Sequence, residues 1–316
     1  MNYLFAKLVI IGYNFPAMES PEQEPRKEKL YRGIQGIEIT SSGWLFKEKE
    51  LYGIVNKLNE ARGNNDQIGI EIYPTNLIVT PYSIKEWEKE YPKAKTTRIH
   101  LPFSHNLSES FYLILNDGFR DKIYDLVWLG VFGVAKNAKA VKIAKQLGLE
   151  INMHPNVVKG FALEGKLDEL KQNVPGVFVE NERPYKNERI IFDPLAIRDL
   201  IKEYQLCGFI FDVEHADKKL FTRIKKYKDK GIDIDSTLNQ TKDVLGMIHI
   251  DTIFKNDTCL NLILSKVSQM EFNHPLKIVL DLSPLPLVRM KIKQKLELLH
   301  ALVETVDSYK EKSEKI

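Results

Sequence analysis

The stretch Phe209-Ile210-Phe211-Asp212-Val213-Glu214-His215-Ala216 decides how we interpret the fold. Large apolar residues lead directly to an acid, and a histidine follows three positions later. An apolar run of this kind is typical of a strand that is buried on both faces, as in a parallel sheet. A carboxylate at the strand end and an imidazole in the next loop are groups that commonly bind a metal ion. We therefore predict a buried strand that ends at a metal site.

Short apolar runs alternate with segments of helical spacing along most of the chain. Nine runs are candidate strands, at residues 8–13, 33–39, 68–73, 97–101, 149–153, 176–179, 208–211, 247–250 and 277–280. Helices are predicted at residues 47–62, 83–91, 108–126, 137–147, 163–172, 194–204, 218–230 and 258–270. This alternation, at a repeat of about 30 residues, indicates βαβ units. We predict an α/β fold, a (β/α)8 TIM barrel with a closed parallel sheet and helices outside, as one domain over residues 1–316.

The candidate strands outnumber the eight that a closed barrel needs. One of the two early runs, 8–13 or 33–39, should therefore lie outside the barrel, while residues 127–134 could hold a further strand or a packed turn. A doubly wound open sheet is the alternative, but the sequence has neither G-x-G-x-x-G nor a P-loop. We expect a mobile loop at residues 14–32. Residues 287–316 should form a final helix and charged tail that covers the barrel or pairs with a second subunit in a homodimer.

The composition is ordinary for a soluble globular protein, with 43% hydrophobic residues, 28% charged residues and a net charge of +3. So small a charge neither requires nor excludes a polyanionic partner. No apolar stretch reaches the length of a membrane span, and the N-terminus has no signal-peptide pattern. Cys207 and Cys259 suggest no disulfide framework, and Cys207 should be a small core residue. We expect a cytoplasmic protein without a membrane partner.

Polar residues gather where the predicted strands end, which is where TIM barrels place functional side chains. These residues are His100, His154, Glu180, Asp212, His215, His249, Asp251 and Asp281. Each alone has an ordinary explanation, such as a core histidine or a helix N-cap. Together they indicate one or two divalent ions such as Zn²⁺, Mn²⁺ or Co²⁺, because imidazoles and carboxylates occur here without thiolates. Glu180, Asp212, His249 and Asp281 would give a four-ligand shell with positions open for water or substrate.

Six short motifs resemble the xylose isomerase-like TIM-barrel superfamily, which contains sugar and sugar-phosphate isomerases and epimerases and the endonuclease IV nucleases (AP endonuclease family 2). They are Ile99-His100-Leu101-Pro102-Phe103, Asn152-Met153-His154-Pro155, Val179-Glu180-Asn181, Phe211 to Ala216, Ile248-His249-Ile250-Asp251 and Val279-Leu280-Asp281. The resemblance implies that Glu180, Asp212, His249 and Asp281 bind the shared metal. It also implies that His100 and His154 hold a further zinc, as in the nucleases. His215 would bind substrate in an isomerase or an additional metal in a nuclease.

The chain departs from this family pattern at two places. Asp281 stands where the family usually has a glutamate, which is one methylene longer. The nucleases also carry an Asp-x-His pair that completes their third metal site, and residues 252–277 contain none. We therefore expect one or two ions rather than three.

Three functions are open at this point. The first, narrowly favoured, is a metal-dependent isomerase or epimerase of a sugar, sugar phosphate or polyol, in which Glu180, Asp281 and His215 act catalytically through an enediolate. Arg183, Lys255 and Asp251 would contact that substrate. The second is a zinc-dependent phosphodiesterase that cuts DNA at apurinic sites. The third is a non-catalytic barrel that binds a ligand at its mouth.

Overall fold

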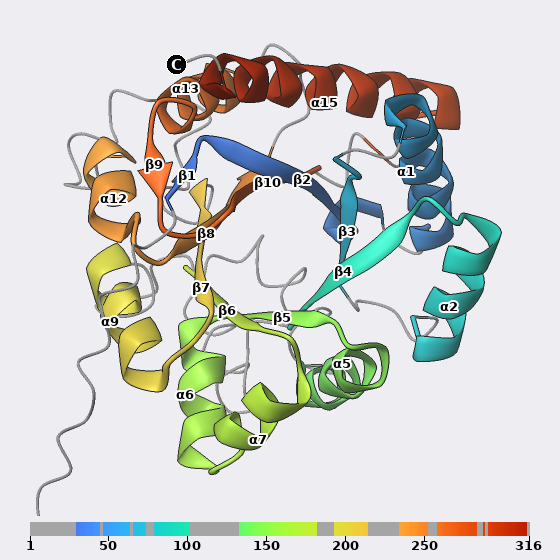
Figure 1. Ribbon diagram of the computed structural model, residues 1–316. Coiled ribbons are helices and arrows are strands. Elements are labelled where there is room, and N and C mark those ends of the chain that lie inside the picture. The colour runs from blue at the N-terminus through green and yellow to red at the C-terminus, as the bar shows by residue number, and fades with distance from the viewer. Residues whose placement is uncertain are drawn as a thin grey trace, which may run out of the picture.

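The computed structural model describes residues 30–44, 47–63, 66–73, 79–101, 133–181, 193–213, 234–251, 258–282, 287 and 290–314. Eight parallel strands form a closed barrel, which confirms the predicted TIM barrel (Figure 1). They are β2 (Ile34–Thr40), β3 (Gly69–Ile72), β4 (Lys95–His100), β5 (Glu150–Met153), β6 (Val177–Glu180), β7 (Gly208–Asp212), β8 (Leu245–Asp251) and β10 (Leu276–Asp281). The barrel closes where β10 pairs with β2. The run at 33–39 is thus a barrel strand, and the run at 8–13 lies outside the described residues.

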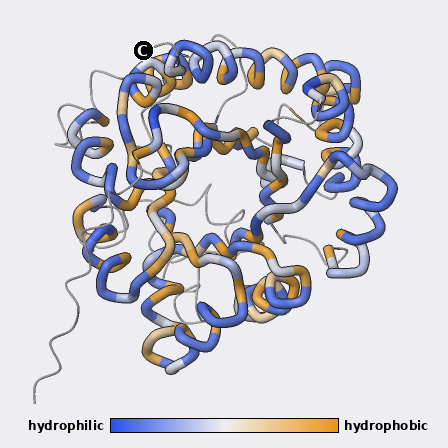
Figure 2. Tube along the Cα trace, in the orientation of Figure 1, coloured by the Kyte–Doolittle hydropathy of each residue, from blue (hydrophilic) through white to orange (hydrophobic). Residues whose placement is uncertain are grey.

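Helices surround the barrel (Figure 1). They are α1 (Glu48–Arg62), α2 (Pro81–Glu90), α5 (Gly133–Leu147), α6 (Pro155–Leu163), α7 (Leu167–Asn173), α9 (Pro194–Tyr204), α12 (Ile234–Thr241), α13 (Thr258–Val267) and α15 (Ile292–Glu314). In Figure 2 they carry hydrophobic residues interspersed with hydrophilic ones, as amphipathic helices do. Residues 133–134, considered for a strand or packed turn, begin α5. The predicted helices at 108–126 and 218–230 lie outside the described residues.

Helix α6 was not predicted. The helix expected at 163–172 corresponds to α7 and the few residues before it, whereas α6 lies further toward the N-terminus, directly after β5. Pro155 occupies the first turn of α6, where proline is well tolerated because its missing N–H would have no helical partner. The β-branched pair Val157 and Val158 and the following Gly160 have low helix propensity, which weakens the local signal. Both valines are fully buried, so packing against the barrel decides the outcome.

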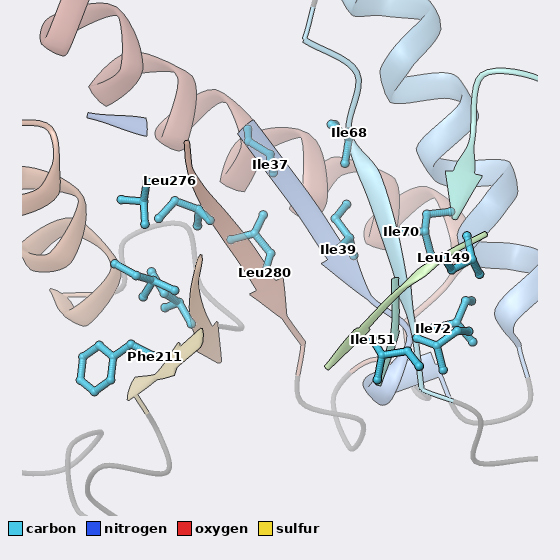
Figure 3. Close-up of a cluster of buried hydrophobic side chains, with 14 of the residues drawn as sticks. Ile37, Ile39, Ile68, Ile70, Ile72, Leu149, Ile151, Phe211, Leu276 and Leu280 are labelled. Carbon is cyan, nitrogen blue, oxygen red and sulfur yellow. The ribbon is translucent and has the colours of Figure 1, made fainter. Parts of the chain in front are cut away.

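Side chains that alternate along each strand divide the barrel into an outer and an inner face. Outward residues such as Ile37, Ile39 and Ile70 join one large apolar core between the strands and the helices (Figure 3). A separate, smaller apolar cluster consists of Ile210, Met247, Val279 and Phe178. These residues lie on the alternate positions of β6, β7, β8 and β10, and we call them the apolar half of the interior.

Charged side chains fill the other half of the barrel interior. Arg98 on β4 is fully buried, and its guanidinium lies 3.0 Å from Glu38, 3.4 Å from Glu71 and 2.7 Å from Glu150. Lys277 adds a second cation, with Nζ 2.7 Å from Glu38 Oε1. We call these five residues the charged half. Burial of so many charges requires close pairing, because an unpaired charge in the interior is strongly destabilising.

The C-terminal helix α15 packs along the outside of the barrel beside α1 (Figure 1). Lys295 of α15 is 2% exposed, donates to Glu50 at 2.6 Å and lies 4.9 Å from the centre of the Trp44 ring. Asp307 forms an ion pair with Arg62 at the end of α1. These contacts hold the final helix against the barrel, which is one of the two roles that the sequence suggested for it. The other role, pairing with a second subunit, stays a prediction.

Three smaller findings complete the fold. Strands β1 (Tyr31–Arg32) and β9 (Glu271–Phe272), which were not predicted, form a two-stranded antiparallel sheet. The expectation that Cys207 is a core residue is wrong: Cys207 is exposed, because it precedes the buried strand β7 rather than belonging to it. Among the described helices, none combines the length and the hydropathy that a membrane span needs.

Candidate metal centre

Five buried side chains meet at the carboxyl ends of neighbouring strands. They are Glu71 of β3, His100 of β4, His154 directly after β5, Glu180 of β6 and His249 of β8. None is more than 6% exposed. They make two groups whose potential ligand atoms lie within 4.8 Å of one another: His100, His154 and Glu180, and Glu71, Glu180 and His249. Glu180 belongs to both groups, so its carboxylate is the centre of the cluster.

The first group offers two imidazole nitrogens and a carboxylate. The Nε2 atoms of His100 and His154 lie 3.2 Å apart, so the two rings point toward one another. The Nδ1 atom of His100 is 2.8 Å from Glu71 and 3.7 Å from Glu180. Nitrogen and oxygen donors without thiolates suit zinc, manganese or cobalt. The chemistry and spacing of these side chains therefore fit a divalent ion.

The second group surrounds His249 with negative charge. Its Nε2 lies 3.3 Å from Glu71 and its Nδ1 lies 3.5 Å from Glu180. Burial disfavours the charged imidazolium, but the carboxylates of Glu180 and Glu71 outweigh burial and raise the pKa of His249 to about 10. Burial likewise opposes the charge of Glu71, yet His249 and His100 hold the pKa of Glu71 well below its usual value. Because a metal binds a neutral imidazole, binding here would release a proton.

Two asparagines fix the carboxyl ends of the strands. Asn152 on β5 donates from Nδ2 to Glu180. Asn181, directly after β6, donates to the carbonyl oxygen of Asp212 at 2.8 Å and accepts from its N–H, also at 2.8 Å. This side chain continues the pairing of β6 with β7 beyond the last residue of β6. The backbone of Asp212 is therefore held rigidly at the end of β7.

The structure places Asp212 and Asp281 beside the cluster rather than within either group of potential ligands among the described residues. Asp212 is 7% exposed, and its charge helps to raise the pKa of His249. Asp281 ends β10 and accepts a hydrogen bond from the hydroxyl of Ser42 in the 3-10 helix η1 (Ser42–Trp44). Their expected role as ligands thus stays a prediction.

Four other predicted residues are not placed by the structure. His215, Arg183 and Lys255 lie outside the described residues. Asp251 ends β8 and pairs in register with Asp281 on β10, but its side chain is outside the described part.

Sequence reasoning missed Glu71. The signal that could have found it is the tetrapeptide Gly-Ile-Glu-Ile, which occurs at residues 36–39 and again at 69–72. A glutamate between two isoleucines in a strand covered by helices must face the barrel interior, because neighbouring residues of a strand point to opposite faces. Glu38 and Glu71 both lie there.

Comparison with known proteins concerns the fold. No family model and no curated protein matches this chain. A D-psicose 3-epimerase from Clostridium cellulolyticum H10, solved with D-tagatose, is 13% identical, with 89% of this chain and 97% of that chain covered and a TM-score of 0.48. A D-allulose 3-epimerase from Methylomonas sp., solved with D-allulose, is 11% identical, with 89% and 98% covered and a TM-score of 0.53. The chain thus shares its barrel fold with this sugar 3-epimerase, as its strand-end motifs led us to expect.

Proposed function

We propose that this barrel is a divalent-metal-dependent isomerase or epimerase of a sugar, sugar phosphate or polyol. The observation that carries the proposal is the position of Glu180, a buried carboxylate that belongs to both groups of potential ligands. These histidines and carboxylates lie at the carboxyl ends of the barrel strands, which is where TIM-barrel enzymes have their active sites. The fold shared with a sugar 3-epimerase is consistent with this function.

The proposed reaction moves a proton between the two faces of a carbon, or between neighbouring carbons, through an enediolate. A bound divalent ion would polarise the carbonyl and hydroxyl oxygens of the substrate, which makes the adjacent C–H more acidic. Glu180 would take the proton, and the hydrogen bond from Asn152 would hold its carboxylate in place. Asp281, three strands further around the barrel, would return a proton from its carboxylic acid, with its side chain held by Ser42.

Solvent exchange tests this proposal directly. Protein loaded with Mn²⁺, Co²⁺ or Zn²⁺ should incorporate deuterium from D₂O at the carbon next to the carbonyl of a ketose, in a panel that includes D-allulose, D-tagatose and ketose phosphates. Glu180→Gln should abolish the exchange and Asp281→Asn should abolish net epimerisation, whereas Asp243→Asn, a carboxylate paired with Arg198 and Lys202 outside the cluster, should leave both unchanged. Failure of every loaded form to exchange any substrate would refute the proposal.

A second candidate, the apurinic-site phosphodiesterase, is favoured by one specific observation. His100 and His154 direct their Nε2 atoms toward one another beside Glu180, which is the pair that the nuclease resemblance implies for a further zinc. Zinc-loaded protein would then nick a duplex that contains a single abasic site and would leave the matching intact duplex uncut. Three zinc ions per chain would favour this function, and one ion would favour the isomerase.

A further inference from the structure

Glu71 holds two histidines of the cluster with its two carboxylate oxygens. Oε1 lies 2.8 Å from Nδ1 of His100, and Oε2 lies 3.3 Å from Nε2 of His249. The side chain is fully buried, so water does not compete for these contacts. One carboxylate therefore contacts a different ring nitrogen on each histidine.

These contacts determine which nitrogen each neutral ring leaves open. A neutral imidazole has one N–H and one lone pair, and a carboxylate can only accept. When a metal takes one nitrogen of each ring, the remaining N–H is placed where Glu71 can accept it: on Nδ1 of His100, which lies 2.8 Å from Glu71, and on Nε2 of His249, whose 3.3 Å contact with Glu71 is shorter than the 3.5 Å contact of its Nδ1 with Glu180. The lone pairs are left on Nε2 of His100, which is 3.2 Å from Nε2 of His154, and on Nδ1 of His249, which is 3.5 Å from Glu180. Each lone pair thus points to a potential ligand of the same cluster.

Glu71 is itself held from the other side by Arg98 and Asn152. Arg98 Nη1 lies 3.4 Å from Glu71 Oε2, and the same guanidinium is paired with Glu38 and Glu150. Asn152 Nδ2 lies 3.5 Å from Oε1. The arginine and the asparagine restrict the rotation of the carboxylate, which a residue needs if it is to orient others.

We propose that Glu71 is a positioning residue that fixes opposite tautomers of His100 and His249, and so selects Nε2 of the first and Nδ1 of the second for the metal. This inference rests on the metal centre proposed above. Carboxylates that accept from the distal N–H of a ligating histidine commonly raise metal affinity by about 10- to 100-fold.

Glu71→Gln tests the proposal with little change in volume. Its amide oxygen can serve one histidine, but its NH₂ group donates and would oppose the N–H of the other. Zn²⁺ or Mn²⁺ affinity, measured by titration calorimetry, should fall by about 10- to 100-fold. Glu38→Gln is the matched control, because Glu38 is equally buried and contacts the same Arg98. We expect this control to change metal affinity by less than about threefold, a limit set well below the effect of losing a ligand-orienting contact.

Two outcomes would overturn the positioning role. One is an equal loss of affinity in Glu38→Gln and Glu71→Gln, or no loss in either. The other is a zinc-loaded structure in which a Glu71 oxygen lies at the bonding distance of about 2.0–2.2 Å, which would make Glu71 a ligand.

Nitrogen-15 spectra of the histidine rings give a second readout that needs only the wild-type protein. Zinc-loaded protein should retain N–H on Nδ1 of His100 and on Nε2 of His249, and the reverse pattern would contradict the proposal even if Glu71→Gln failed to fold. If wild-type protein bound neither ion, the metal function itself would be refuted. Normal binding by wild type with unchanged binding by Glu71→Gln would refute only the positioning role.

Discussion

Replacement of Arg98 by methionine should destabilise the barrel severely. Arg98 is fully buried and lies within 3.4 Å of three carboxylates, so its removal leaves their charges without their main cation. Methionine fills a similar volume, and the effect will therefore report lost charge pairing rather than a cavity. It also removes the contact of the guanidinium with the Phe178 ring, whose centre is 5.1 Å away.

The magnitude follows from what remains around each carboxylate. Glu38 keeps Lys277 at 2.7 Å, and the Glu150 side chain is 29% exposed and can be hydrated. Glu71 has no exposure and keeps its contacts to His100 and His249. Removal of one partner from a buried ion pair costs about 3–5 kcal/mol. We expect a loss of about 4 kcal/mol, which at a urea m-value of about 3 kcal/mol/M lowers the unfolding midpoint by about 1.3 M.

Urea unfolding followed by circular dichroism measures this loss. Arg62→Met is the matched control, because Arg62 pairs with Asp307 at the surface with side chains 17% and 30% exposed. That partly exposed pair should contribute about 1 kcal/mol or less. The double variant Arg98→Met, Glu71→Gln should recover about 1–3 kcal/mol relative to the sum of the single changes. An Arg98→Met loss no larger than that of Arg62→Met would refute the reasoning.

Three further predictions concern the strand ends, the barrel interior and pH. Asn181→Ala leaves a buried N–H and carbonyl of Asp212 without this partner and should cost about 2–6 kcal/mol in urea unfolding, at about 1–3 kcal/mol for each group; an unchanged midpoint would contradict this. Gly208→Ala brings a Cβ to 2.8 Å from the carbonyl of Val244 and should lower stability by about 1–3 kcal/mol, whereas Gly36→Ala, with its nearest contact at 3.5 Å, should cost less. In metal-free protein the pKa of His249, about 10 when folded, lies above the ordinary value of 6.5, so its stabilising contribution is complete below pH 6.5 and is lost as the pH rises through 10. The urea midpoint of protein in EDTA should therefore fall between pH 7 and 10, and a fall of the same size in His249→Gln would exclude His249 as its source.

The sequence predicted the barrel because its signals are local. The barrel strands and most of the helices show their periodicity within a few residues, and the eight barrel strands agree closely with the predicted runs. His100, His154, Glu180 and His249 were recognised because polar residues at strand ends are unusual after apolar runs. Glu71 was missed because it lies within a strand and its partners are 29 and 178 residues away. Only closure of the barrel brings it to them.

The arrangement around Asp212 and Asp281 also depends on contacts between residues that are far apart in the sequence. Motif order predicts that both lie near Glu180 and His249, and strand register places them at the same end of the barrel. Side-chain direction depends on contacts that motifs do not contain. Ser42 follows β2, the strand that pairs with β10 to close the barrel, and its hydroxyl donates to Asp281 at the end of β10. A prediction from residue order can therefore name the site but not its ligand geometry.

The division of the barrel interior into a charged and an apolar half has a consequence for how this protein can diverge. In the apolar half, Ile210, Met247 and Val279 can each exchange for another aliphatic residue of similar volume at small cost, so single steps are tolerated. In the charged half, exchange of Arg98, Glu38 or Glu71 leaves a buried charge without one of its partners, and a coordinated change at a second position is needed to restore stability. We expect the residues of the apolar half to change independently of one another, and those of the charged half to change only together. A combinatorial library of the two sets, sorted for folded protein, would show independent substitutions in the first and strongly coupled ones in the second.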